Sequence, residues 1–158
     1  MNPFETVIKD LAEITGLPLQ VEADDSCTLE TNDMMITMQY RRELDNVIIF
    51  APVMVAEEEE RLPYGVLQKA LELSYEGKGT HNAFLGMFNG ALVLSVLLPM
   101  NGLDADSLAV RILAFTDTAQ GIALELENVL DNEGGFERQN KDASEENGAM
   151  NRDMIFQV

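Results

Sequence analysis

The sequence is poor in basic residues, with 10 Lys and Arg against 28 Asp and Glu, and it contains one cysteine and one histidine. The formal net charge of -18 argues against nucleic-acid binding, which needs clustered Lys and Arg, and against docking on an anionic membrane surface. A single cysteine excludes an internal disulfide and is typical of a reducing cytosol. A strongly acidic surface favours solubility.

Long apolar runs are also missing, since no stretch reaches the roughly 20 residues that cross a bilayer. The first ten residues lack the basic and then apolar pattern of a signal peptide. We therefore expect a soluble, cytoplasmic protein with no membrane insertion. The 158 residues are 46% hydrophobic, which predicts one domain with a genuine core and a possible tail.

Catalytic patterns are equally scarce. His81 lies in a polar loop without a legible nucleophile or orienting partner, which predicts an ordinary surface histidine. Cys27 has acidic neighbours that would raise its thiol pKa, so it is predicted to be a buried structural cysteine. Glu57–Glu60 lack the spacing of a calcium loop, and "GKGT" at residues 77–80 lacks the spacing of a phosphate loop. We predict no catalytic, cofactor-binding or metal-binding residue, and no enzyme.

The first half of the chain predicts a helix followed by three strands. Asn2, Pro3 and Glu5 are typical of a capped helix start, and Gly16 predicts its end. Residues 27–31 form a strand candidate. Alternating apolar and polar residues over 34–41 predict a second, half-buried strand. Residues 47–51 are apolar throughout, which predicts a third strand that is covered on both sides or lies in the middle of the sheet.

The second half predicts a helix, a hairpin and a last helix. Pro63 opens a helix to about Tyr75, which carries more apolar surface than one contact face requires. Asn89-Gly90 predicts a tight turn between strands 83–88 and 91–98. Asp104 is the expected cap of the last helix, which we expect Gly134-Gly135 to close. Its predicted apolar stripe comprises Leu108, Ile112, Phe115, Ala119, Ile122, Leu126 and Val129.

These elements predict an α+β fold with the order helix, three strands, helix, two strands, helix. We expect residues 1–132 to form this domain around a mostly antiparallel five-stranded sheet. Residues 133–158 are expected to be an acidic, disordered tail, because 136–152 are polar and patternless. Methionines in or beside the strands are either ordinary core or an adaptable binding surface. They are Met34, Met35, Met38, Met54, Met87 and Met100.

The order of elements resembles the class I type III secretion chaperones, the CesT/SycE-like family of small acidic bacterial proteins. The resemblance covers roughly residues 4–130. It is carried by "VIKDLAEITGLPL", "CTLETND", "ITMQY", "VIIFAPV", "LPYGVLQKALELSY", the hairpin "FNGALVLSVLLPMNGLD" and "LAVRILAFTDTAQGIALEL". It implies a homodimeric chaperone, without enzymatic activity or cofactor, that binds an extended N-terminal segment of a secreted effector. It also implies delivery to the secretion machinery, including its ATPase.

Two surfaces are expected to carry this function. The surplus apolar surface of the helix after Pro63 predicts a homodimer contact at Val66, Leu67, Ala70, Leu71 and Ser74. Effector binding is expected at exposed apolar patches on the first helix and the outer strands, because a sheet with helices on one face leaves its other face open. The candidate residues are Phe4, Ile8, Leu29, Met35 and Met38.

Two other functions fit the same pattern. A regulator or adaptor of the same fold, such as a YbjN-like domain, would lack a secreted cargo. A small-molecule-binding domain or enzyme could use the apolar hairpin as a pocket wall, but no convergent set of polar residues supports it. Retention of an effector fragment during purification would distinguish the chaperone from the regulator.

Overall fold

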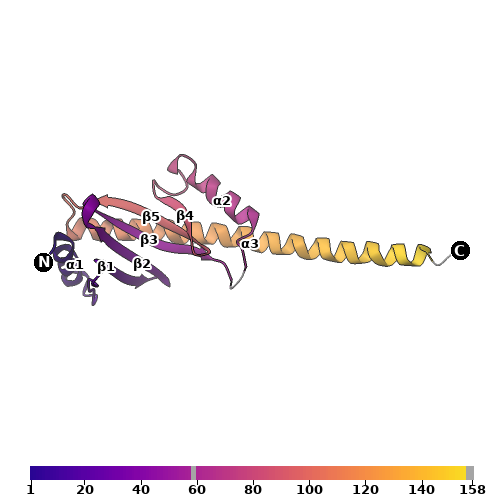
Figure 1. Cartoon of the computed structure of the whole chain (residues 1–158), viewed down its shortest axis with the longest axis horizontal. Helices are drawn as coiled ribbons and strands as arrows, with labels where there is room; N and C mark the ends of the chain where they lie inside the picture. Colours follow the sequence, from indigo (N-terminus) through magenta and orange to yellow (C-terminus); the bar gives the residue numbers. More distant parts are fainter. Residues whose placement is uncertain (58–59, 156–158) are drawn as a thin grey trace.

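A computed structural model describes the backbone of residues 1–57 and 60–155 and the side chains of residues 1–57 and 60–133. Its elements confirm the predicted order (Figure 1). They are α1 (Pro3–Thr15), β1 (Ser26–Thr31), β2 (Met34–Arg41), the 3-10 turn η1 (Arg42–Leu44), β3 (Asn46–Val55), α2 (Tyr64–Ser74), the 3-10 turn η2 (Tyr75–Gly77), β4 (Phe84–Phe88), β5 (Ala91–Pro99) and α3 (Ala105–Ile155).

The five strands form one antiparallel sheet in the order β1-β2-β3-β5-β4. β3 lies at its centre, which agrees with the apolar character of both its faces. The register shifts between Pro52 and Met54, as expected where proline cannot donate to the ladder. Asn89 and Gly90 both have positive φ, 47° and 77°, so the predicted tight turn joins β4 to β5.

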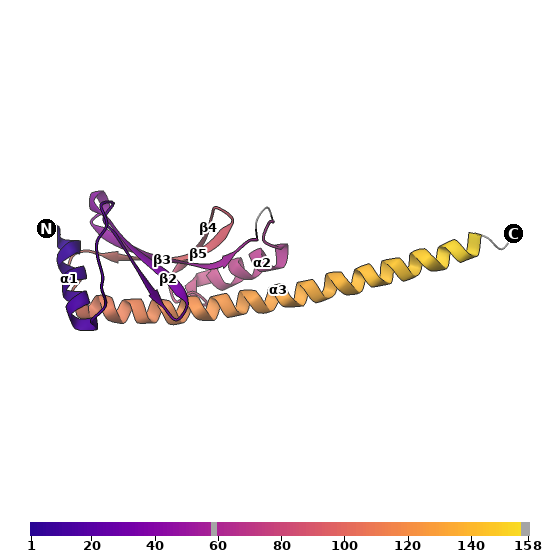
Figure 2. The same ribbon diagram turned by 90° about the horizontal axis from the view of Figure 1, so that it is seen from below.

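All three helices pack on the same face of this sheet (Figure 2). α3 runs along the sheet, α1 lies at one end of it, and α2 lies against α3 and β4. The predicted stripe of α3 is buried from Leu108 to Leu126, while Val129 is partly buried. The core therefore lies between one helical layer and one sheet, and none of the described helices covers the opposite face of the sheet.

Local hydrogen bonds set the helix ends as the sequence predicted. Asn2 Oδ1 accepts from the Glu5 backbone N–H at 2.8 Å, and Glu5 Oε2 accepts from the Asn2 N–H at 2.9 Å, which completes a capping box. Gly16 ends α1 at a φ of 71°. Asp104 Oδ1 accepts from the Ser107 N–H at 2.8 Å and caps α3.

The end of the last helix differs from the prediction. α3 continues through Gly134 and Gly135 to Ile155, so these two glycines do not close it. Glycine lowers helix propensity by only about 1 kcal/mol per residue, and here no proline follows that would stop the helix. The side chains of the expected tail, 133–158, lie outside the described residues except Glu133. The division into a domain and a disordered tail stays a prediction.

Candidate functional site

Four of the five expected effector-binding residues are buried, so the expectation that they form exposed patches is wrong. Phe4, Ile8 and Met38 are 0 to 1% exposed and Leu29 is 9% exposed, whereas Met35 is 52% exposed. The reason is the position of α1, which turns its apolar stripe toward the sheet. The ring of Phe4 stacks on Tyr40 with centroids 6.0 Å apart. Met38 pairs with Ile49 on the side that the helices cover.

An apolar groove lies where α1, β1 and α3 meet, and we call it the α1–β1–α3 groove. Its volume is about 250 Å³, and its wall is mainly apolar. Leu29 is the one predicted patch residue within it. The lining residues are Leu11, Thr15, Leu17, Leu19, Leu29, Glu30, Thr31, Ala109, Ile112, Leu113 and Thr116.

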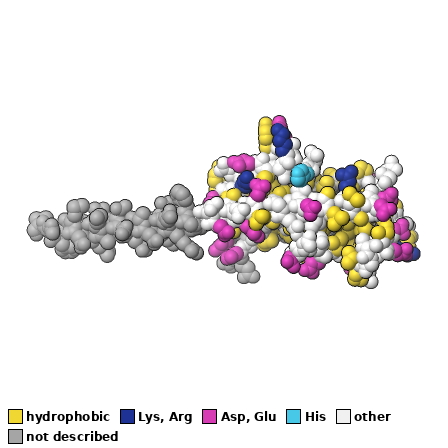
Figure 3. All heavy atoms as spheres, turned by 180° about the vertical axis from the view of Figure 1, so that it is seen from behind, with side chains coloured by type: hydrophobic (Ala, Val, Ile, Leu, Met, Phe, Trp, Pro, Cys, Tyr) yellow, Lys and Arg dark blue, Asp and Glu magenta, His cyan; other side chains and the backbone are white. Residues whose placement is uncertain are grey.

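The groove lies beside an edge of the sheet. In the described part of the chain, β1 pairs with β2 on one side and with no strand on the other. An edge strand presents backbone N–H and C=O groups that another strand can use. Leu17 is 45% exposed and Leu113 is 66% exposed, so the groove also offers apolar surface to a partner. Figure 3 shows hydrophobic side chains gathered with acidic ones at the α1 end of the domain.

A second groove lies between α2 and the opposite edge of the sheet, and we call it the α2–β4 groove. Its volume is about 300 Å³. It is lined by Leu67, Ala70, Leu71, Ser74, Leu85, Gly86, Met87 and Leu92. Four of the five residues expected at a dimer contact line it. Val66 does not, because it is 0% exposed and belongs to the core of its own protomer.

The exposed side of α2 continues this apolar surface. Tyr64 and Leu71 on α2, and Tyr75 directly after its last residue, are 70 to 81% exposed and follow helical spacing. β4, which carries the exposed Met87 and Phe88, is the other edge strand of the sheet. The surplus apolar surface that the sequence predicted for this helix is therefore present.

The uncovered face of the sheet also carries apolar residues. Phe50 pairs with Ser95, which pairs with Phe84, so the three lie in one row across the sheet. Phe84 and Leu97 are 47% and 43% exposed. Ile48 pairs with Leu97 in the neighbouring row, so apolar residues adjoin one another across the centre of this face.

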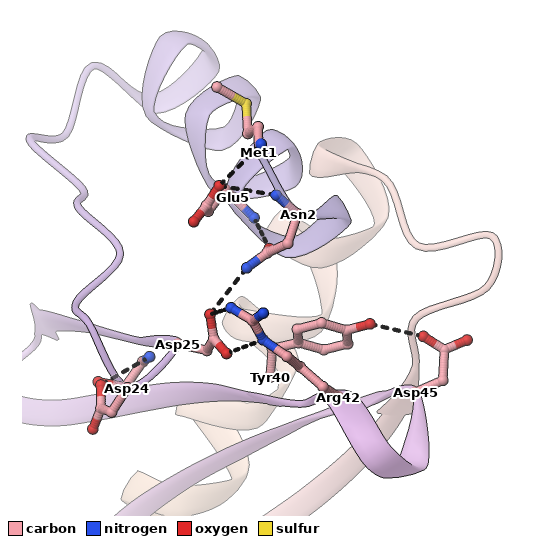
Figure 4. A network of polar contacts seen from close by, with 9 residues as sticks. Met1, Asn2, Glu5, Asp24, Asp25, Tyr40, Arg42 and Asp45 are labelled. Carbon is pink, nitrogen blue, oxygen red and sulfur yellow. Dashed lines mark hydrogen bonds and ion pairs between the residues drawn. The ribbon is translucent and has the colours of Figure 1, made fainter.

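A polar network joins the start of α1 to the loop before β1 and to the turn between β2 and β3 (Figure 4). Asp25 Oδ1 accepts from Asn2 Nδ2 at 2.9 Å and from Arg42 Nη2 at 2.7 Å. The hydrogen bond and charge of Arg42 hold the pKa of Asp25 below its usual value. Tyr40 donates its hydroxyl to Asp45 Oδ1 at 3.0 Å, which raises the pKa of Tyr40. The network fixes α1 at one end, and thereby one wall of the groove.

His81 and Cys27, the one histidine and the one cysteine, line neither groove. His81 is exposed, as predicted, and its Nδ1 lies 2.9 Å from Thr118 Oγ1. Cys27 is buried, as predicted, and burial raises the pKa of its thiol. Within residues 1–57 and 60–133, no cluster of three or more His, Cys, Asp or Glu is placed to hold a metal ion. None of the described helices is long and apolar enough to cross a membrane.

The methionines divide between the two alternatives that the sequence left open. Met38, Met54 and Met100 are buried and fill the core, and Met34 packs partly against it. Met35 and Met87 are 52% and 58% exposed. Met87 lines the α2–β4 groove, so adaptable apolar packing is available at one of the two candidate surfaces.

The fold is that of the type III secretion chaperones. A chain of the HopA1–SchA chaperone–effector complex matches with a TM-score of 0.64 at 12% identity, covering 77% of this chain and 93% of that one. A chain of the ExsC–ExsE complex matches with a TM-score of 0.62 at 15% identity, covering 73% and 87%. YbjN, a putative transcription regulator from E. coli, matches with a TM-score of 0.56 at 18% identity, covering 78% and 90%.

The sequence identifies the family directly. Residues 6–123 match the model of the Tir chaperone protein (CesT) family, and the chain belongs to this family. It is therefore a chaperone of type III secretion. No curated protein matches the sequence.

Most residues of the α1–β1–α3 groove could not be found from the sequence. Leu17 and Leu19 lie in an irregular segment, and Leu113 lies outside the predicted stripe of α3. An apolar residue on the polar side of an amphipathic helix was the one available signal.

Proposed function

We propose that this chaperone binds an extended, N-terminal segment of a secreted effector along β1 and in the α1–β1–α3 groove. The observation that carries the proposal is the combination of an edge strand, which has no partner strand on its outer side in the described residues, with an apolar groove beside it. The chain would act in the bacterial cytoplasm and keep the segment soluble and competent for secretion. One or more effectors could use the same groove.

The physics of strand addition supports this mode of binding. The backbone of an added strand bonds to the sheet edge, and every second side chain faces the groove. An unfolded segment loses conformational entropy on binding, so apolar contact must offset that cost. Leu17, Leu19 and Leu113 provide such contact. The net charge of -18 keeps a protein with exposed apolar surface in solution.

The proposal includes a homodimer through the α2–β4 groove. Leu67, Ala70, Leu71 and Ser74 line this groove, and Tyr64 and Tyr75 extend its apolar surface. A specific dimer buries roughly 1,200 to 2,000 Å² in total. A dimer would present two effector grooves at a distance from its contact. Delivery would bring the loaded chaperone to the secretion-system ATPase.

A regulator of the same fold without secreted cargo is the alternative. The likeness to YbjN concerns the fold at 18% identity and favours neither function by itself. Membership of the CesT family favours the chaperone.

The test is co-expression with the product of the neighbouring coding region, followed by proteolysis of the purified complex. We expect an N-terminal segment of that product to be retained and protected. Leu113→Asp should abolish retention while the chaperone stays folded, because Leu113 is 66% exposed in the groove. Val110→Asp is the matched control, since Val110 is 65% exposed on the same helix but outside the groove. Equal loss with both variants, or retention with both, would place effector binding elsewhere.

A further inference from the structure

We infer that the effector segment bound in the α1–β1–α3 groove has apolar side chains inside the groove. It carries Lys or Arg at the point where the segment leaves the groove between α1 and α3. The inference rests on the proposed function and adds the chemistry of the segment. It depends on a hollow of the surface next to the groove and on the arrangement of charges around that hollow. It also depends on the apolar residues between the groove and the hollow.

The hollow lies between α1 and α3, one turn along from the residues of these helices that line the groove. α1 contributes Leu11 and Thr15 to the groove, and Asp10, Glu13 and Ile14 to the hollow. The start of α3 and the residue before it supply the other wall, with Asp104, Ala105 and Asp106. An extended segment that follows the groove along α1 therefore reaches four carboxylates at this end.

Among the residues whose side chains the structure describes, the groove and the hollow are lined by acids and not by bases. The residues lining the groove and the hollow include no Lys, Arg or His, and Glu30 adds a further carboxylate to the groove. In the part of the chain whose side chains are described, no ion pair involves the four acids of the hollow. Lys9 and Arg111, the cations nearest in sequence, line other hollows.

The local structure explains the negative charge of two of the four acids but not that of the other two. Asp104 caps α3, and Asp106 lies in its first turn, where the helix dipole favours negative charge. Asp10 and Glu13 lie toward the other, negative end of α1, three residues apart on one face. The last turn of α1 contains no basic residue. Neither charge caps a helix, and a cation on a bound segment would lie between two like charges that are close on one helix face.

The apolar residues between the two regions define the rest of the segment. Ile14 is 57% exposed in the hollow and Leu17 is 45% exposed in the groove. A segment that covers both must place apolar side chains against them before its charged residues meet Asp10 and Glu13. Charge complementarity selects such a segment over an acidic one and increases its rate of association.

The test measures the binding of short synthetic peptides with alternating Leu and Ser, ending in either two Lys or two Gln at one terminus. For the terminus that enters the hollow, we expect the Lys peptide to bind about three- to tenfold more tightly at low salt. The difference should disappear in the double variant Asp10→Asn, Glu13→Gln and should shrink at high salt. Glu43→Gln with Glu127→Gln is the control, because it removes equal charge from exposed positions outside the groove.

The outcomes separate this inference from the proposed function. The Lys and Gln peptides could bind equally well whichever terminus carries these residues, and Leu113→Asp could abolish the binding of both. That result would overturn the inference and leave the groove as the effector site. If the control variant lost the preference for the Lys peptide to the same extent, the inference would also be overturned, because the preference would then come from the net charge of the protein. Binding unaffected by Leu113→Asp would overturn both.

Discussion

Asp25, in the loop before β1, accepts a hydrogen bond from Asn2, the N-cap residue of α1, with 2.9 Å between Asp25 Oδ1 and Asn2 Nδ2. The same carboxylate forms an ion pair with Arg42, whose Nε lies 2.5 Å from Asp25 Oδ2. Three segments that are distant in sequence therefore share one side chain. Asp25 has a φ of 60°, a conformation that Asp and Asn adopt more readily than most residues.

The first prediction concerns the pH dependence of this contact. The pKa of folded Asp25 is lowered by Arg42, so its ionised form stabilises the fold above the ordinary Asp pKa. This contribution is lost as pH falls through the lowered pKa. Asp25→Asn should lower the melting temperature at about pH 6, and the difference from wild type should shrink as pH falls below the ordinary Asp pKa and through the lowered one. Asp131→Asn, at an exposed site, should show no such difference. A difference independent of pH would contradict the electrostatic explanation.

The second prediction distinguishes two methionines of β2. Met38→Asp should prevent folding, because it places a carboxylate in the core at a position that is 0% exposed. Met35→Asp should fold with a nearly unchanged melting temperature, because Met35 is 52% exposed on the uncovered face. Circular dichroism during heating measures both. If Met35→Asp folds but loses effector capture, the uncovered face contributes to binding. If it unfolds, Met35 belongs to the core.

The third prediction concerns the dimer. Leu71→Asp should convert the proposed dimer into a folded monomer, because Leu71 is 74% exposed and lines the α2–β4 groove. Sedimentation at micromolar concentration measures the change. Leu44→Asp is the control, since Leu44 is 61% exposed outside that groove, and it should remain dimeric. A monomeric wild-type protein would rule out the proposed homodimer.

The fourth prediction compares two glycines that both have open space around an added Cβ atom. Gly16→Ala should destabilise the protein by about 1 kcal/mol, because Gly16 has a φ of 71° at the end of α1. Gly121→Ala should stabilise it by about 0.5 to 1 kcal/mol, because Gly121 lies within α3. Urea unfolding gives both free energies. The same sign for both substitutions would contradict the role of Gly16 as a left-handed cap.

The sequence by itself determined the elements and most of their ends, because these depend on neighbouring residues. Asn2 and Glu5 lie three residues apart and cap α1 whatever the rest of the chain does. Asn89 and Gly90 supply the positive φ values of the β4–β5 turn for the same reason. The apolar period of α3 likewise predicted which of its residues would be buried, and the whole order of elements indicated the family. The helix end expected at Gly134-Gly135 failed because glycine disfavours a helix without stopping it.

The tertiary structure alone decided which apolar residues remain exposed. Period two in β2 separates Met35 from Met38, but it does not say which face the helices cover, and that depends on how α1 packs. Phe4 and Ile8 became core because the polar network around Asp25 and the apolar stripe of α1 hold this helix on the sheet. The α1–β1–α3 groove exists because Leu17, Leu29 and Leu113 meet in space. No local pattern encodes that meeting, since it is set by the packing of three elements that are far apart in sequence.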